Sequence, residues 1–396
     1  MRYSLLNFIF CPFCGGELTC VAPEEISAEV KNTFSDVFNR VNKKNAVIGP
    51  VPHFKRKTTF TKILTKHSSS PDSPERNRKV DIMKGLLVCG ECGHWYPISN
   101  FVPELLPDHL RDWEKDVKFL SEFYESLPKK LYKKLLKRVK FFQERMNEIL
   151  DDAQDYKKAE MSIKDKITDE DFFEPGYSSP FNEDDPEFTQ NLIKRFSLVL
   201  PLLELKQNHI VLDVGSGYSW TTEWLLKMGF EPVGVDICRT YIDIGIERMG
   251  SIRPHLIVAD VENLPIKDTR LNSILCYDSF HHIPNRKEAM AHFFRALRKD
   301  GLVVLAEPGR DHEQAQVSID VMEKFGILEK GIEAKDVKEY CLRLNFLPPE
   351  QYFMLKIHQE EQGKVLTSKF IKSHSFVECN IFVIRKAAER ETVRNG

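Results

Sequence analysis

The chain has 396 residues, enough for two or three domains, and 42% of them are hydrophobic, so it can bury a sizeable core. Its formal net charge of −2 argues against a protein whose overall charge is adapted to nucleic acid or acidic membranes. No run approaches the roughly 18 apolar residues that a membrane helix needs, and the apolar start (1–10) lacks a signal-peptide cleavage site. We therefore expect a cytoplasmic protein whose nine cysteines serve metal binding or the core rather than disulfides.

Four of the cysteines form two C-x-x-C pairs. Cys11 and Cys14 make the first pair and Cys89 and Cys92 the second, and each pair is followed by a glycine that frees the backbone to wrap around an ion. Four thiolates favour tetrahedral zinc with no open position, which is a structural site worth roughly 10–16 kcal/mol of apparent binding free energy. We interpret the nearby Cys20 and His94 as residues outside the ligand set.

The two pairs are unusually far apart. A compact zinc ribbon separates them by about 15–20 residues, whereas here a long insertion (about 21–84) intervenes. The insertion begins helix-like (26–41) and continues into a Ser/Pro-rich loop (68–74). We therefore predict a small α+β zinc-binding module over 1–110.

Residues 111–187 read as a helical linker and lid. Apolar residues recur at helical spacing over 113–127, and a lysine-rich amphipathic helix is predicted over 129–142. Its lysines fit contact with the phosphates of RNA or lipid head groups, or a solvated face above an apolar stripe, which is the interpretation we favour. The loop 172–181 is a candidate lid element that carries Tyr177 toward a ligand.

The second half opens with the motif D-x-G-x-G at 213–217, between an apolar run and a helix-like segment. Only glycine lets a strand feed a helix while the backbone approaches a ligand closely. A second apolar run ends at Asp236, roughly 20 residues beyond the first glycine, where a doubly wound fold places a carboxylate on ribose hydroxyls. Trp220 occupies the third small position of a dinucleotide fingerprint and argues against a dinucleotide.

Further motifs follow in order. They are A-D-V-E-N-L-P at 259–265, Y-D-S-F-H-H at 277–282 and K-D-G-L-V-V-L at 299–305. Together they resemble a class I S-adenosylmethionine (SAM) methyltransferase, and most of all the group of ubiquinone/menaquinone-biosynthesis methyltransferases, over about 188–386. The resemblance implies an α/β, Rossmann-like seven-stranded sheet in a domain spanning 188–396, whose two late strand-like runs supply a sixth strand and an antiparallel seventh beside the fifth.

The resemblance also implies a cofactor site for SAM. The motif at 213–217 would hold the methionine part, Asp236 the ribose hydroxyls and Asp260 the adenine amino group, while Tyr277 would line the floor. The full set of predicted cofactor residues is Asp213, Gly215, Ser216, Gly217, Asp236, Ile237, Asp260, Val261, Tyr277 and Tyr177.

Residues 85–107 carry a second resemblance. Their pattern, from G-L-L-V-C to V-P-E-L-L-P, is similar to the small zinc-binding activator subunit of tRNA, rRNA and release-factor methyltransferases, although Phe101 stands where that family has a glycine. The resemblance implies an activator supplied in cis, so we expect no separate activator subunit. It also implies that zinc removal destabilises the catalytic half.

Methyl transfer needs a base only if the acceptor must lose a proton. The candidates at strand ends are Asp278, His281 and Glu307, with His282 interpreted as packing locally. The N/D-P-P-Y/F motif of adenine and glutamine methylases is absent. We predict methyl transfer to a small-molecule, glycan or lipid-linked acceptor; the alternatives are an RNA (tRNA or rRNA) methyltransferase and a non-catalytic SAM-binding scaffold.

Overall fold

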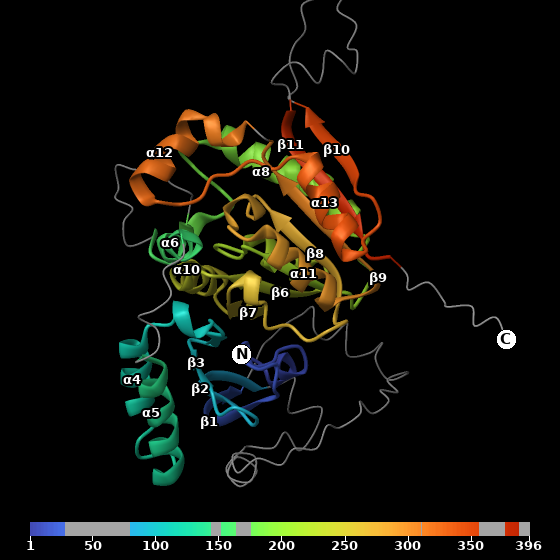
Figure 1. Cartoon of the computed structure of the whole chain (residues 1–396). Coiled ribbons are helices and arrows are strands. Elements are labelled where there is room, and N and C mark those ends of the chain that lie inside the picture. Colours follow the sequence, from blue (N-terminus) through green and yellow to red (C-terminus); the bar gives the residue numbers. More distant parts are fainter. Residues whose placement is uncertain (28–79, 144–151, 164–175, 310, 356–376, 388–396) are drawn as a thin grey trace, which may run out of the picture. The chain divides into compact units, whose positions relative to one another are not determined.

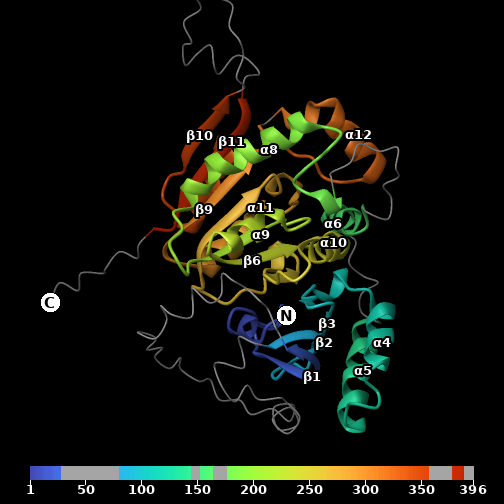
Figure 2. The same cartoon turned by 180° about the vertical axis from the view of Figure 1, so that it is seen from behind.

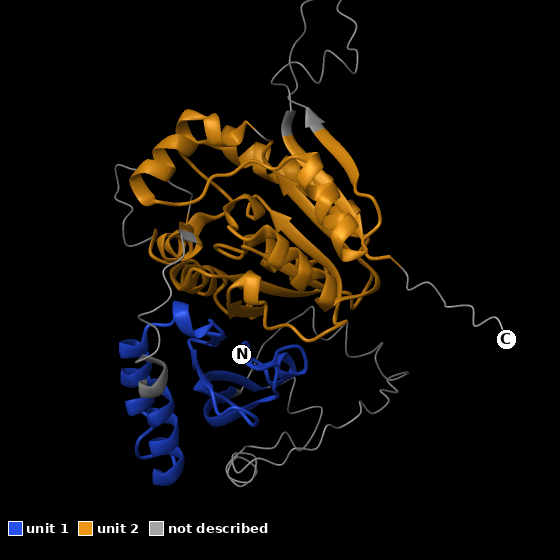
Figure 3. Cartoon of the chain, in the orientation of Figure 1, with its two compact units in different colours: residues 1–148 blue, residues 149–396 orange. Residues whose placement is uncertain are grey.

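The computed structural model describes residues 1–27, 80–143, 152–163, 176–309, 311–355 and 377–387. The chain divides into two compact units, Met1–Glu148 and Ile149–Gly396 (Figure 3). The helix and the Ser/Pro-rich loop predicted within the insertion fall almost wholly outside the described residues. The insertion itself is narrower than predicted, because regular strands run into both of its ends.

The first unit is built on a four-stranded antiparallel sheet. Its strands lie in chain order: β1 (Leu18–Ser27), β2 (Val80–Cys89), β3 (Trp95–Ser99) and β4 (Val102–Pro103), with η1 (Tyr3–Asn7) before them and η2 (Asp108–Leu110) after. Leu18, at the start of β1, pairs with Cys89, at the end of β2. The two C-x-x-C loops therefore emerge at the same end of one hairpin.

Two helices complete this unit, α4 (Trp113–Ser121) and α5 (Lys129–Gln143). The apolar faces of both helices form one buried cluster with residues of the sheet, and the indole of Trp95 donates a hydrogen bond to the backbone oxygen of Leu135 (3.3 Å). The observed boundary near 148 therefore differs from the predicted one near 110. α5 packs on the sheet of the zinc module because Leu131, Leu135 and Val139 recur on one of its faces.

The second unit contains a seven-stranded sheet with the order β10-β11-β9-β8-β5-β6-β7 (Figures 1 and 2). Its strands are β5 (Ile210–Val214), β6 (Glu231–Asp236), β7 (His255–Val258), β8 (Leu271–Tyr277), β9 (Leu297–Glu307), β10 (Glu350–Leu355) and β11 (Val377–Arg385). β5 to β9 pair in parallel, and β11 lies antiparallel between β9 and β10. This confirms the predicted sheet with its inserted antiparallel strand.

Helices cover both faces of this sheet. α11 (Arg286–Ala296) and α13 (Ala334–Leu344) lie on the face seen in Figure 1, and α8 (Pro186–Val199) and α9 (Trp220–Lys227) lie on the opposite face, seen in Figure 2. The remaining helices and 3-10 turns of this unit are α6 (Asp152–Met161), η4 (Gly176–Ser178), η5 (Leu200–Leu203), α10 (Arg239–Met249), η6 (Val261–Asn263), η7 (Phe280–His282), η8 (His312–Gln314) and α12 (Gln316–Phe325). Because both faces are covered, the central strands β5, β6 and β8 are mostly apolar and buried.

An aromatic cluster joins α8 to the sheet. Phe196 lies edge-on to Trp220, Trp224 and Tyr277, with ring centroids 5.2, 5.8 and 5.9 Å apart. Trp220 therefore fills core space between α8 and α9, which the third glycine of a dinucleotide fingerprint would leave empty. Within the described residues, no helix combines the length and the apolar character required to traverse a bilayer.

Candidate active site at the carboxyl ends of the strands

The loops that follow the parallel strands enclose a cavity of about 340 Å³ in the second unit. The turn after β5 forms part of its wall, and there Gly215 and Gly217 both have positive φ (63° and 49°). A Cβ on Gly215 would lie 2.4 Å from the Cβ of Ser279 in the loop after β8. Only glycine therefore lets these two loops meet at the cavity wall.

Asp236 stands at the end of β6, in the cavity wall. Its carboxylate oxygens accept hydrogen bonds from the backbone N–H groups of Gly217 and Cys238, both at 2.8 Å. Burial raises its pKa to about 7, with the nearby Glu160 raising it further against those two hydrogen bonds. The carboxylate is thus held in one orientation beside Ile237, which also lines the cavity.

Asp260 follows β7 and contributes the adjoining part of the wall. Its oxygens accept hydrogen bonds from the backbone N–H of Glu262 (3.0 Å), the amide of Asn263 (3.0 Å) and the ammonium of Lys157 (2.9 Å). Val261 lines the cavity next to it. The structure therefore brings together six of the predicted cofactor residues: Gly215, Gly217, Asp236, Ile237, Asp260 and Val261.

The other four predicted cofactor residues do not line this cavity. Asp213 instead accepts hydrogen bonds from the hydroxyls of Thr221 and Thr222 at the start of α9. Tyr277 is buried in the aromatic cluster, and its hydroxyl donates to the backbone oxygen of Leu192 (2.7 Å). The remaining two are Ser216, whose side chain is buried behind the turn, and Tyr177, which is 59% exposed and donates to Glu247 (3.2 Å).

Helix α6 supplies wall residues that the sequence did not reveal. Tyr156, Lys157 and Glu160 of α6, and Ile163 shortly after it, all line the cavity, in a segment that the sequence predicted as part of a helical linker and lid. Lys157 is 5% exposed and forms ion pairs with both Asp260 and Glu262. These contacts bridge about a hundred residues of sequence, so no local motif marks them. Burial, together with repulsion from Glu329, raises the pKa of Glu160 to about 7.

Asp278 is the predicted catalytic residue that reaches the cavity. It has a positive φ (56°), a strained conformation for a non-glycine residue of the kind that gathers at functional sites. Its carboxylate pairs with the guanidinium of Arg195 at 3.2 Å. Burial alone would raise its pKa, but Arg195 and the neighbouring histidines outweigh this and hold the pKa below its usual range. Asp278 therefore presents a negative charge to the cavity and is a weak base.

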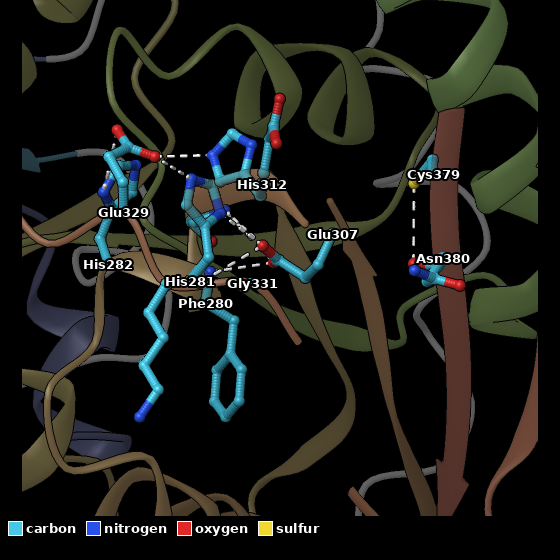
Figure 4. Close-up of polar contacts among 12 residues, drawn as sticks. Phe280, His281, His282, Glu307, His312, Glu329, Gly331, Cys379 and Asn380 are labelled. Carbon is cyan, nitrogen blue, oxygen red and sulfur yellow. Dashed lines mark hydrogen bonds and ion pairs between the residues drawn. The ribbon is translucent and has the colours of Figure 1, made fainter. Parts of the chain in front are cut away.

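Glu307 and His281 contact each other (Figure 4), and neither lines the cavity. Glu307 is fully buried and accepts hydrogen bonds from the backbone N–H of Phe280 (2.9 Å) and from Nδ1 of His281 (2.8 Å). Burial lowers the pKa of His281, but the hydrogen bonds to Glu307 and Glu329 dominate and raise it to about 10. Glu307 and His281 are therefore engaged with each other, and of the three predicted catalytic residues Asp278 is the one that lines the cavity.

His282, by contrast, lines the cavity, although the sequence suggested local packing. Its Nδ1 lies 2.9 Å from the backbone oxygen of Leu328, so this nitrogen carries the proton and Nε2 keeps its lone pair. Burial and the charge of His281 lower its pKa to about 4. The chain thus places a neutral imidazole in the wall, beside Asp278 and Glu329.

The first unit holds the predicted metal site. The Sγ atoms of Cys11, Cys14, Cys89 and Cys92 all lie within 4.8 Å of one another. The pairs Cys11–Cys92 and Cys14–Cys89 are 3.7 and 3.5 Å apart, close to the roughly 3.8 Å that a tetrahedron of Zn–S bonds of about 2.3 Å requires. The four thiolates therefore fit a structural zinc ion, as predicted.

His94 belongs to the surroundings of this cluster. Its Nδ1 lies 3.1 Å from the Sγ of Cys92 and its Nε2 lies 3.0 Å from the carboxylate of Asp108. Cys20 is buried on β1 and is not part of the cluster. Since metal ligands are oriented by partners of this kind, His94 supports the site without completing it.

The fold and the cavity define a SAM-dependent methyltransferase domain of the Rossmann-like class. The family described as "Methyltransferase domain" matches residues 212–305, from β5 to β9, and the family described as "Trm112p-like protein" matches residues 2–100. This particular chain therefore joins a Trm112p-like domain to a methyltransferase domain. The predicted enzyme class and cofactor are confirmed for that domain, as is the resemblance of the zinc module.

Individual relatives share about a quarter of their aligned residues with this chain and match only part of it. The methyltransferase GfsG of Streptomyces halstedii is 26% identical over 172 residues, which cover 42% of this chain and 59% of GfsG. The uncharacterized protein MJ0638 of Methanocaldococcus jannaschii is 26% identical over 152 residues, covering 38% of this chain and 62% of that protein. The chain thus spans about 60% of the length of these curated relatives. A solved SAM-dependent methyltransferase of Archaeoglobus fulgidus aligns with 50% of this chain and 94% of its own, at 16% identity and a TM-score of 0.40.

Proposed function

We propose that the protein transfers a methyl group from SAM to a small-molecule, glycan or lipid-linked acceptor, with the Trm112p-like domain as a built-in zinc-bound stabiliser. The observation that carries this proposal is the convergence of Gly215, Gly217, Asp236 and Asp260 on one cavity inside a methyltransferase domain. We further propose a cytoplasmic location and no requirement for a separate activator subunit.

Different residues of the wall bind different parts of the cofactor. The glycine turn lets the backbone approach the ligand, Asp236 accepts hydrogen bonds from ribose hydroxyls, and Asp260 with Val261 flanks the adenine. When bound, SAM supplies an electrophilic methyl group on a positively charged sulfur. The negative charge of Asp278 suits this cation, while His281 and Glu307 act from behind by fixing the loop after β8.

The acceptor end of the cavity favours a small molecule over RNA. An apolar part of the wall comes from the segment after β9, through Val317, Val321, Phe325 and Ile327. Carboxylates dominate the polar part of the wall, and Lys157 is already paired with two of them. A polyanion gains little from such a surface, whereas an acceptor with an apolar body buries it there.

RNA is the second candidate, and two observations favour it. The zinc module resembles the activator subunit of tRNA and rRNA methyltransferases, and Lys129, Lys130, Lys133 and Lys137 are exposed along α5. The third alternative is a scaffold that binds SAM without turnover.

The test uses methyl-tritiated SAM with the purified full chain and an extract of its own cells. Label that resists nuclease and runs with metabolites or glycans supports the proposal, and nuclease-sensitive label supports RNA. Binding of SAM without label in any fraction supports the scaffold. Calorimetry with Asp236→Ala checks the site itself: we expect SAM affinity to fall by roughly ten-fold or more for the loss of charge-assisted hydrogen bonds, and unchanged affinity would contradict the assignment.

A further inference from the structure

We propose that His281, His282 and Glu329 form a binding site for a divalent transition-metal ion at the acceptor end of the cavity. The metal site itself stands on the geometry of this cluster. Its use in catalysis rests on the proposed function. The three residues come from η7 and from the segment between α12 and α13, and they meet where His282 and Glu329 line the wall.

The side chains converge on a common point (Figure 4). One ligand atom from each of the three residues lies within 4.8 Å of the others. Nε2 of His281 lies 3.4 Å from Oε2 of Glu329, and Nε2 of His312 lies 2.7 Å from the same oxygen. Ligands of one ion at about 2.0–2.2 Å lie roughly 3–4 Å apart, so small side-chain adjustments suffice to bind it.

Glu307 gives the cluster the second layer that metal sites require. It accepts a hydrogen bond from Nδ1 of His281 at 2.8 Å, which leaves Nε2 of that ring directed at Glu329. Glu307 is itself fixed by the backbone N–H groups of Ser279 and of Phe280 at the start of η7, and it is fully buried. A carboxylate behind a ligating imidazole sets the tautomer and the orientation of the ring.

The donor set selects the kind of ion. Two imidazoles and one carboxylate, with His312 adjoining, suit Zn²⁺, Co²⁺, Ni²⁺ or Fe²⁺ and are a poor match to Mg²⁺ or Ca²⁺, which prefer oxygen ligands. Three protein ligands leave positions open, as in sites that act on substrates rather than on folding. The four-cysteine cluster of the first unit is closed by comparison.

An ion at this place would bind and acidify a hydroxyl of the acceptor. The O–H bond would break and its proton would pass to solvent. The oxygen lone pair then forms the new O–CH₃ bond while the CH₃–S bond breaks. The bonding pair stays on sulfur, so the products are the methyl ether and S-adenosylhomocysteine, and the ion is unchanged.

The experiment separates this site from the four-cysteine cluster. Full-length protein with its zinc site filled is titrated with Co²⁺ by calorimetry, and SAM binding is measured in parallel. We expect one further Co²⁺ to bind the wild type and the matched control His292→Gln, which changes a histidine of α11 outside the cluster. We expect this event to disappear in Glu329→Gln and to weaken by roughly 10–100-fold in Glu307→Gln.

His282→Gln keeps the test decisive if the buried variants do not fold, because that side chain is 27% exposed. Loss of Co²⁺ binding in this folded variant supports the site. Absence of a second Co²⁺ event in the wild type, or equal binding by all variants, overturns it and leaves an ion-pair network without metal. Failure of the proposed function has a different signature, since the tritium label from SAM would then enter RNA or no fraction at all, whatever the Co²⁺ titration shows.

Discussion

At the scale of single residues, the site depends on positions where one added atom or one charge changes the shape or the electrostatics of the cavity. Gly215 allows the loops after β5 and β8 to touch, and Asp278 is held at positive φ where its charge meets the cavity. Asp236 and Glu160 are two acids with raised pKa values on the same wall. Such residues can be altered one at a time without changing the topology.

Gly215→Ala should impair both folding and SAM binding. The added Cβ would lie 2.4 Å from Ser279, and alanine disfavours the φ of 63°. We expect a loss of about 1–3 kcal/mol of stability and a weaker SAM isotherm, measured by thermal melting and calorimetry. Gly250→Ala is the matched control, because Gly250 has a φ of 61° with nothing within 4 Å of its Cβ position. Equal effects of both variants would show that backbone strain alone is responsible.

Glu160→Gln should alter how stability depends on pH. The pKa of Glu160 is raised from 4.5 to about 7, so the folded state holds its proton more tightly than the unfolded chain. The contribution of this protonated carboxyl group to the free energy of unfolding is complete below about pH 4.5 and is lost as the pH rises to about 7. The groups that face it electrostatically are Asp236, Glu329 and His281. The melting temperature of Glu160→Gln should therefore exceed that of the wild type by a margin that grows from about pH 5 to 8. Parallel curves of melting temperature against pH would contradict this.

At the scale of elements, α6 is the main addition to what the sequence predicted. Lys157 ties this helix to the loop after β7, and Tyr156 and Glu160 bring it into the cavity wall. A lone helix of this length has little stability of its own. Its position therefore depends on the ion pairs of Lys157 and on the apolar contacts of Ala159 and Ile163 with Phe325 and its neighbours.

Lys157→Met should detach α6 from the cavity. Removing the cation leaves Asp260 and Glu262 buried without it, a loss of about 3–5 kcal/mol. We expect lower melting temperature and weaker SAM binding. Lys158→Met is the matched control, since Lys158 is the exposed neighbour on the same helix. Similar losses from both variants would mean that the buried ion pair is not what holds the helix.

Some features of the site could be predicted from the sequence and others could not, depending on how far apart the interacting residues lie in the chain. Motifs at the ends of the parallel strands were predictable, because each lies next to its strand and all such ends meet at one edge. Tyr277 was predicted to line the floor of the cofactor site, but neighbouring residues at a strand end point to opposite faces, so Asp278 lines the cavity and Tyr277 is buried in the core. Lys157, Glu160 and Glu329 could not be found, because their partners are distant in sequence and no spacing rule connects them.

At the scale of the whole molecule, the chain combines two units with different sources of stability. The second unit has a large apolar core on both faces of its sheet. The first has a small sheet, two helices and four convergent thiolates. Metal binding is folding free energy for a small module of this kind.

Zinc removal should therefore unfold the first unit before the second. We expect a strong chelator, or Cys89→Ser, to lower the melting temperature of the first unit by many degrees. If the Trm112p-like domain stabilises the catalytic half, methyl transfer and the second transition should fall with it. Cys20→Ala is the control, because Cys20 is a buried thiol outside the cluster. Full methyl transfer after complete loss of zinc would refute the stabilising role.

The pairing of β1 with β2 has a practical consequence for the insertion. Ser27 and Val80 face each other across the ladder, so the chain leaves the hairpin and re-enters it at a single rung. A tight turn of about four residues can therefore replace 28–79 without moving the cysteine loops at the other end. The shorter connection reduces the entropic cost of closing this loop by roughly 2 kcal/mol of free energy. The protein with the short turn should thus be more stable and should bind zinc equally well. It is therefore a suitable starting point for crystallisation and for grafting foreign segments at this rung.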